Sequence, residues 1–167
     1  MTFLVDGELC PEGLGQTGED GSFDRIETTC RDWIRDDPDA RFQPEAGRYH
    51  LYVARACPWA HGAVLVRKLL GLEDAVSMDV VDPYRDERGW QFTPEKPGCT
   101  PDTLFGHDYL ADVYREADPD YTGKVSVPVL WDREEGTIVN NESIEVMRML
   151  ASEFGAFAEF DLDLYPE

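Results

Sequence analysis

Residues 48–71 constrain the fold more strongly than any other segment of the chain. Tyr49–Ala54 is a run of aromatic and aliphatic residues of strand length, and Cys57 and Pro58 follow it almost at once. Proline is favoured at the first position of a helix, and apolar residues then recur at helical spacing until Gly71, a residue type that suits a helix end. The sequence therefore predicts a buried strand, a cysteine and a helix in immediate succession.

The rest of the chain supplies the other elements of a small α/β fold. We expect further strands at residues 75–81, 125–131 and 137–140, and helices at residues 109–117 and around 143–150. The polar loop 132–136, which ends in glycine, is typical of a hairpin between the last two strands. The order β-α-β-α-β-β-α, with one parallel crossover followed by a hairpin, satisfies the layer rules of α/β proteins.

The two ends of the chain carry weaker signals. Residues 1–47 are rich in Gly, Asp, Glu and Pro and are interpreted as an N-terminal arm with one short helix at residues 27–35. Residues 48–153 form the predicted α/β domain, and residues 154–167 are interpreted as a linker or tail. Residues 13–18 match GxGxxG, but no strand precedes them and no helix follows, so nucleotide binding is disfavoured.

Charge excludes several classes of partner. Acidic side chains number 35 against 15 basic ones, which gives a formal net charge of -20. Nucleic acids and acidic membrane surfaces are therefore poor partners. No apolar run reaches the length of a membrane helix and no leader peptide is evident, so we expect a cytoplasmic protein. The four cysteines include no CxxC pair, which argues against a zinc knuckle or a disulfide framework.

Cys57 is the candidate catalytic nucleophile. At the start of a helix, backbone N–H groups and the positive end of the helix dipole favour the thiolate; a buried, inert cysteine is the alternative. Ala60 stands where a dithiol oxidoreductase has its second cysteine, so any disulfide must be mixed. His61 lies one helical turn away and is expected to neighbour the thiol rather than to bind a metal, because no further ligand is close in sequence. Trp59 could offer a flat surface to an aromatic acceptor, or could simply be a packing residue.

Two further motifs suit the binding of a peptide-like thiol. Val127-Pro128 opens a strand, and we expect a cis bond that exposes the backbone of Val127 as a docking edge. Glu142-Ser143 begins the last helix and offers a carboxylate, a hydroxyl and backbone N–H groups to an amino-acid terminus. A plain helix cap is an equally good interpretation of Glu142-Ser143.

Four blocks of sequence together resemble the glutathionyl-hydroquinone reductases, which are the xi-class glutathione S-transferases. The blocks are RYHLYVARACPWAH (48–61), RGWQF (88–92), DYTGKVSVPVLWD (120–132) and TIVNNES (137–143). The resemblance covers nearly the whole chain and implies a thioredoxin-like N-terminal domain. In that family an all-helical C-terminal domain follows, and this sequence ends about where it is expected to begin.

The resemblance also implies roles for individual residues. Cys57 would attack the sulfur of a glutathionyl-hydroquinone, take up glutathione as a mixed disulfide and release the hydroquinone. Trp90 would pack against glutathione, Val127 with Pro128 would hold its cysteinyl backbone, and Glu142 with Ser143 would hold its γ-glutamyl end. Gly62 and Ile144 depart from the family pattern, which has Arg and Ser there.

Several hypotheses therefore remain open. The chain is interpreted as a thiol-dependent reductase or transferase that uses glutathione, or γ-glutamylcysteine in a halophilic host, with a quinone-type aromatic molecule as its second substrate and no metal. The first alternative is a non-catalytic thiol-binding half that needs a separate helical partner subunit or forms a homodimer. The second is a monothiol glutaredoxin-like protein.

The acidic excess predicts a dependence of stability on salt. Negative charge spread along the whole chain causes self-repulsion that concentrated cations screen, so we hypothesise a halophilic host. The melting temperature is expected to rise between low and molar salt, and circular dichroism during heating measures it. An unchanged melting temperature would favour an acidic protein of an ordinary cytosol.

Overall fold

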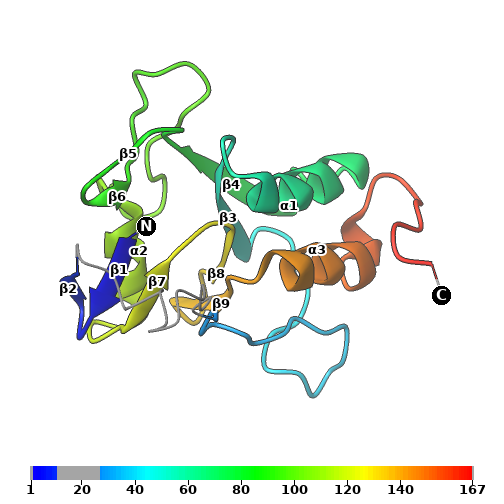
Figure 1. The fold of residues 1–167 in the computed structure, drawn as a ribbon. Helices are drawn as coiled ribbons and strands as arrows, with labels where there is room; N and C mark the ends of the chain where they lie inside the picture. The colour runs from blue at the N-terminus through cyan, green and yellow to red at the C-terminus, as the bar shows by residue number, and fades with distance from the viewer. Residues whose placement is uncertain (1, 11–26, 167) are drawn as a thin grey trace, which may run out of the picture.

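A four-stranded sheet forms the centre of the molecule in this computed structural model, which describes residues 2–10 and 27–166. The sheet order is β4-β3-β8-β9 (Figure 1). β3 is parallel to β4, whereas β8 is antiparallel to both of its neighbours. Its strands are β4 (Val76–Val81), β3 (Tyr49–Ala54), β8 (Val129–Asp132) and β9 (Thr137–Asn140).

Helices cover both faces of this sheet. α1 (Pro58–Leu69) and α3 (Ser143–Ser152) lie side by side on one face, and α2 (Leu110–Ala117) lies on the other (Figure 1). The strand β3, the crossover helix α1 and the strand β4 form the predicted parallel unit, and β8 and β9 form the predicted hairpin. This arrangement is thioredoxin-like and confirms the fold class expected from the sequence. No helix in the described residues is long and apolar enough to cross a membrane.

The helix α1 follows the local signals in the sequence. Pro58 occupies its first turn, where a missing N–H costs nothing. Gly71 has a φ of 67° just beyond its end, a conformation that other residues rarely adopt. Gly62 leaves the helix unbroken, and a Cβ added there would overlap Sδ of Met147 on α3. The glycine therefore allows α1 and α3 to approach closely.

The strand predicted at residues 125–131 is wrong in its extent. The segment contains two strands, β7 (Gly123–Val125) and β8, separated by the cis peptide bond between Val127 and Pro128. The cis bond itself was expected. β7 belongs to a second sheet with order β2-β1-β7, where β1 is Thr2–Val5 and β2 is Glu8–Leu9. The chain therefore changes sheets at Pro128, because proline has no N–H to continue a ladder.

The helix predicted at residues 27–35 is also wrong. This segment is extended and lies along β9, the edge strand of the main sheet: Arg31 forms a β-bridge with Asn140, and the amide of Asp32 donates to the carbonyl of Val139 at 2.9 Å. An edge strand has unpaired backbone groups, and the arm satisfies some of them. The GxGxxG match at residues 13–18 lies outside the described residues.

The long segment between β4 and α2 is held by buried polar contacts. It contains the short hairpin of β5 (Arg85–Asp86) and β6 (Gly89–Trp90). Asp79 on β4 accepts hydrogen bonds from the amide and hydroxyl of Thr103 at 2.7 and 2.8 Å, and the Tyr52 hydroxyl donates to Asp102 at 3.0 Å. These bonds fix an otherwise irregular segment to β3 and β4.

The tail packs back on the domain. Phe154 is fully buried, and its ring meets that of Tyr49 edge to face at 5.7 Å between centroids. A short 3-10 helix follows at Gly155–Phe157, and the amide of Glu159 donates to the carbonyl of Leu70 at the end of α1. The sequence alone gave this segment no partner.

The close approach of α1 and α3 yields a test. Alanine favours a helix by about 1 kcal/mol over glycine, yet Gly62→Ala is expected to lower the melting temperature because its methyl group overlaps Met147. In a Met147→Ala background the same change should raise it. Thermal unfolding of the single and double variants measures this reversal. An equal effect in both backgrounds would show that Met147 does not restrict position 62.

Candidate functional site

The register of the main sheet brings three loops to one edge. Tyr52 on β3 pairs with Val129 on β8, and Leu130 pairs with Asn140 on β9. Because β8 is antiparallel to both neighbours, the end of β3, the start of β8 and the end of β9 coincide. The segments 55–58, 126–128 and 141–143, which carry most of the predicted site residues, therefore lie along the same edge.

Cys57 is positioned by the transition from β3 to α1. It is the N-cap of α1, with extended φ and ψ of -97° and 111°, and its amide donates to the carbonyl of Ala54 at 3.0 Å. Its side chain is partly buried, and Sγ lies 3.8 Å from the carbonyl oxygen of Val127. The thiol therefore faces the backbone that precedes Pro128.

A cavity of about 240 Å³ lies over this thiol. Trp90 is almost buried in its wall, whereas Trp59 is 65% exposed at the helix start. The guanidinium of Arg85 lies 4.7 Å from the centre of the Trp90 ring, a cation–π distance. Among the described residues, the lining contains two cations and no acidic side chain: Ala56, Cys57, Pro58, Trp59, Arg85, Trp90, Lys124, Val125, Ser126 and Val127. In so acidic a chain, this composition favours an anionic ligand group.

A second cavity, of about 360 Å³, lies at the start of α3. Its lining mixes both signs of charge: Glu27, Thr28, Arg31, Glu142 and Ile144. The Thr28 hydroxyl donates to Oε2 of Glu142 at 3.2 Å, so the arm and α3 contact each other here. A cavity with paired carboxylates and a guanidinium suits a ligand group that is itself both cationic and anionic.

The hydroxyl of Tyr114 on α2 connects two of the three loops. It donates to the carbonyl of Ser126 at 2.9 Å and accepts from the amide of Ser126 at 3.2 Å and from Nδ2 of Asn141 at 3.1 Å. Tyr114 is fully buried, and burial raises its pKa, so the hydroxyl keeps its proton. One side chain therefore holds the residues that immediately precede Val127 and Glu142.

The predicted residues are distributed unevenly around these cavities. Cys57, Trp59, Trp90 and Val127 line the first cavity together. Glu142 lines the second.

Three further predicted residues lie outside both linings. Pro128 is buried, and so is Ser143, the first residue of α3. His61 is exposed and lines neither cavity. The described residues contain no cluster of three or more His, Cys, Asp or Glu side chains that could hold a metal ion.

Sequence reasoning missed four residues at this edge. Arg85 and Lys124 line the first cavity, Arg31 lines the second, and Tyr114 holds the loops. The scarcity of basic residues in this chain is the one signal that could have pointed to the three cations.

Comparisons with known proteins show which family the chain is similar to. The family model for the N-terminal domain of glutathione S-transferase matches residues 56–153. The glutathionyl-hydroquinone reductase of Escherichia coli K12 is 42% identical, over 99% of this chain and 52% of that protein. The chain spans about half the length of the curated relatives it matches.

Two solved structures support the same grouping. A xi-class glutathione transferase from Natrialba magadii is 58% identical, with a TM-score of 0.88, and the match covers 100% of this chain and 49% of that one. The glutathione-bound structure of a glutathione transferase homologue from Escherichia coli K-12 is 39% identical, with a TM-score of 0.79, over 98% and 49% of the two chains.

The Tyr114 hydroxyl yields a test of how the edge is held. Tyr114→Phe leaves buried polar groups of Ser126 and Asn141 without this partner and is expected to cost about 1–3 kcal/mol of unfolding free energy. Faster hydrogen exchange at the Ser126 amide should accompany the loss. Urea unfolding and exchange measured by NMR check both effects.

Tyr49→Phe is the matched control. It also removes one buried hydroxyl, which donates to the carbonyl of Gln43 at 2.6 Å, but at the opposite end of the sheet. In Tyr49→Phe the free energy of unfolding should fall, while the Ser126 amide should stay protected from hydrogen exchange. Equal exchange in both variants would refute the positioning role of Tyr114.

Proposed function

Because the chain belongs to the glutathionyl-hydroquinone reductases, the xi-class glutathione S-transferases, we propose that it is a glutathione-dependent reductase with Cys57 as its catalytic nucleophile. The observation that carries this proposal is the cavity in which the Cys57 thiol, the Val127 carbonyl and the Trp90 ring come together. The cavity has room for a thiol ligand above the sulfur and presents backbone to hold it.

The proposed reaction has two steps that balance. The Cys57 thiolate attacks the sulfur of a glutathionyl-hydroquinone, so that an S–S bond forms and the bond between sulfur and the aromatic carbon breaks. That carbon takes the electron pair and a proton, and the hydroquinone leaves. A second thiolate then attacks the mixed disulfide, which releases a disulfide and restores Cys57. The aromatic ring gains the two electrons that the two sulfurs lose.

The surrounding residues support the binding of such a thiol. The backbone of Val127, followed by Pro128, would pair with the cysteinyl unit, and Trp90 would pack against the ligand. Glu142 would receive the ammonium of a γ-glutamyl end, with Ser143 beside it at the start of α3. Glutathione and γ-glutamylcysteine share that end, so either thiol fits this proposal. Trp59, exposed at the mouth, would contact an aromatic acceptor.

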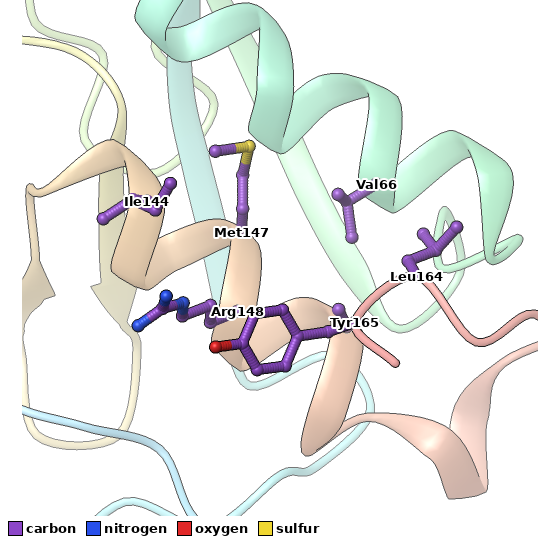
Figure 2. A pocket seen from close by; sticks show the side chains of 7 residues that line it. Val66, Ile144, Met147, Arg148, Leu164 and Tyr165 are labelled. Atoms are coloured by element: carbon purple, nitrogen blue, oxygen red, sulfur yellow. The ribbon is translucent and has the colours of Figure 1, made fainter. Parts of the chain in front are cut away.

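A second candidate function is that of a half that acts only with a helical partner, from another subunit or a second copy. The outer faces of α1 and α3 favour it, because Leu65, Leu69 and Ile144 are each close to half exposed. Residues of α1, α3 and the C-terminal tail together line a largely apolar groove of about 210 Å³. Figure 2 shows its lining: Val66, Ile144, Met147, Arg148, Ala151, Leu164 and Tyr165.

One experiment tests both candidates. In molar salt, the chain is incubated with a glutathionyl-hydroquinone and either glutathione or γ-glutamylcysteine, and release of the hydroquinone is followed by chromatography. We expect release by the wild-type chain and none by Cys57→Ser, because serine cannot form the mixed disulfide. Mass spectrometry should detect the adduct on Cys57 alone.

Cys99→Ser is the matched control, because Cys99 is also partly exposed but lines neither cavity. It should release hydroquinone at the wild-type rate. A Cys57 adduct that forms with glutathione disulfide, without release of hydroquinone from the glutathionyl-hydroquinone, would favour the half that needs a helical partner. An adduct that persists in Cys57→Ser would place the chemistry on another cysteine and contradict the proposal.

A further inference from the structure

Arg31 belongs to the arm, yet it lines the cavity at the start of α3 together with Glu142. We propose that Arg31 is a specificity-determining residue that binds the α-carboxylate of a γ-glutamyl thiol. This inference rests on the proposed function, because it assigns a contact to the far end of the ligand whose sulfur reacts at Cys57. It predicts that the arm helps to determine which thiol binds.

The backbone of the arm places Arg31 in line with the rest of the site. Its β-bridge to Asn140 continues the row of paired residues that crosses the sheet from Leu51 on β3 through Leu130 on β8. Strands lie about 4.8 Å apart, so β9 is about 10 Å from β3. From the sulfur of a cysteinyl unit to the α-carboxylate of its γ-glutamyl unit, a fully extended chain spans a similar length, about 10 Å. A γ-glutamyl thiol held at Cys57 could therefore place its far end beside β9 and the arm.

The side chain of Arg31 is held in one orientation. Its Nε donates to Oε2 of Glu145 at 2.7 Å, and its Nη2 donates to Oε1 of the same carboxylate. Asn140 fixes that carboxylate in turn, because its Nδ2 donates to Oε2 at 2.8 Å. Nη1 of Arg31 has no acceptor in residues 2–10 and 27–166, so one edge of a pre-organised guanidinium is available to a ligand.

Among the described residues that line this cavity, Arg31 supplies the positive charge that favours a zwitterion over a simple amine. Glu27 and Glu142 line the same cavity and attract an ammonium group. They repel a carboxylate, as does the net charge of -20 on the whole chain. The guanidinium of Arg31 offsets that repulsion where the α-carboxylate of a γ-glutamyl group would lie. Ile144 supplies an apolar wall for the methylene groups between the two ends.

Two probe thiols isolate the contact. Reduced glutathione carries the α-carboxylate, whereas 4-aminobutyryl-cysteinyl-glycine lacks only that group. Binding of each is measured by titration calorimetry in molar salt, in a Cys57→Ser background that prevents exchange. Arg31→Gln is expected to weaken glutathione binding about tenfold, the usual scale for one hydrogen bond to a charged group. Binding of the 4-aminobutyryl probe should change less than twofold.

Arg41→Gln is the matched control. Arg41 is also an arm arginine paired with a glutamate: Nε and Nη2 lie 2.8 and 2.6 Å from Oε2 of Glu135. It lies outside the second cavity, so its loss should leave the ratio of the two affinities unchanged. Should Arg31→Gln fail to fold, Arg31→Lys tests the same contact, because lysine keeps the positive charge but cannot donate two parallel hydrogen bonds as a guanidinium does. Arg31→Lys should weaken the binding of glutathione more than the binding of the 4-aminobutyryl probe.

The remaining outcomes contradict the inference in distinguishable ways. An equal loss for both probes would make Arg31 a structural residue, and no loss for either would remove it from the site. If the wild-type chain still releases hydroquinone through Cys57, either result overturns the role of Arg31 and leaves the proposed function standing. Absence of glutathione binding in the Cys57→Ser parent, together with absence of any adduct in wild type, overturns the proposed function as well.

Discussion

The antiparallel pairing of β8 between β3 and β9 is the constraint on which the site depends. It aligns the end of β3 with the start of β8 and the end of β9. Three loops that are distant in sequence therefore meet at one edge of the sheet. A shift of register by one residue would turn every side chain of β8 to the opposite face. The hydrophobic effect that fixes the register of this buried strand therefore also fixes where Cys57 and Glu142 lie.

Side chains then set the loops within that frame. The Tyr114 hydroxyl satisfies backbone and amide groups of Ser126 and Asn141 from the opposite face of the sheet. A polar group that is buried without a hydrogen-bond partner lowers the stability of the fold, so these groups keep their positions. The arm contributes from the other direction, through the pairing of Arg31 with Asn140 and Glu145. A helix on one face of the sheet and the arm along its edge strand thus both contribute to the site.

The parts of the fold that were predictable are those whose signals lie close together in sequence. A strand run, Pro58 and Gly71 define β3 and α1 within a single short segment, and the turn before Thr137 defines the last hairpin. The arm was mispredicted because the apolar spacing around Cys30 also fits a helix. Its backbone partners on β9 are more than 100 residues away, and no local pattern reveals them.

The same distinction separates the site residues. Cys57, Trp90 and Glu142 stand in recognisable motifs, so the sequence could predict these three residues of the cavity linings. Arg31 and Tyr114 have no motif around them. Their importance comes from contacts with residues of β9, α3 and the Ser126 loop, and these contacts exist only in the folded chain.

The acidic charge of the chain also determines how it can recognise an anionic thiol. Long-range attraction is weak, because carboxylates outnumber cations by more than two to one. In molar salt the screening length falls to about 3 Å, so distant charges neither attract nor repel strongly. Salt screens the interaction between charged groups least when the groups are in direct contact, at about this distance. Recognition in such a medium must therefore rely on pre-organised groups within hydrogen-bond reach, and the guanidinium of Arg31, fixed by Glu145, has that character.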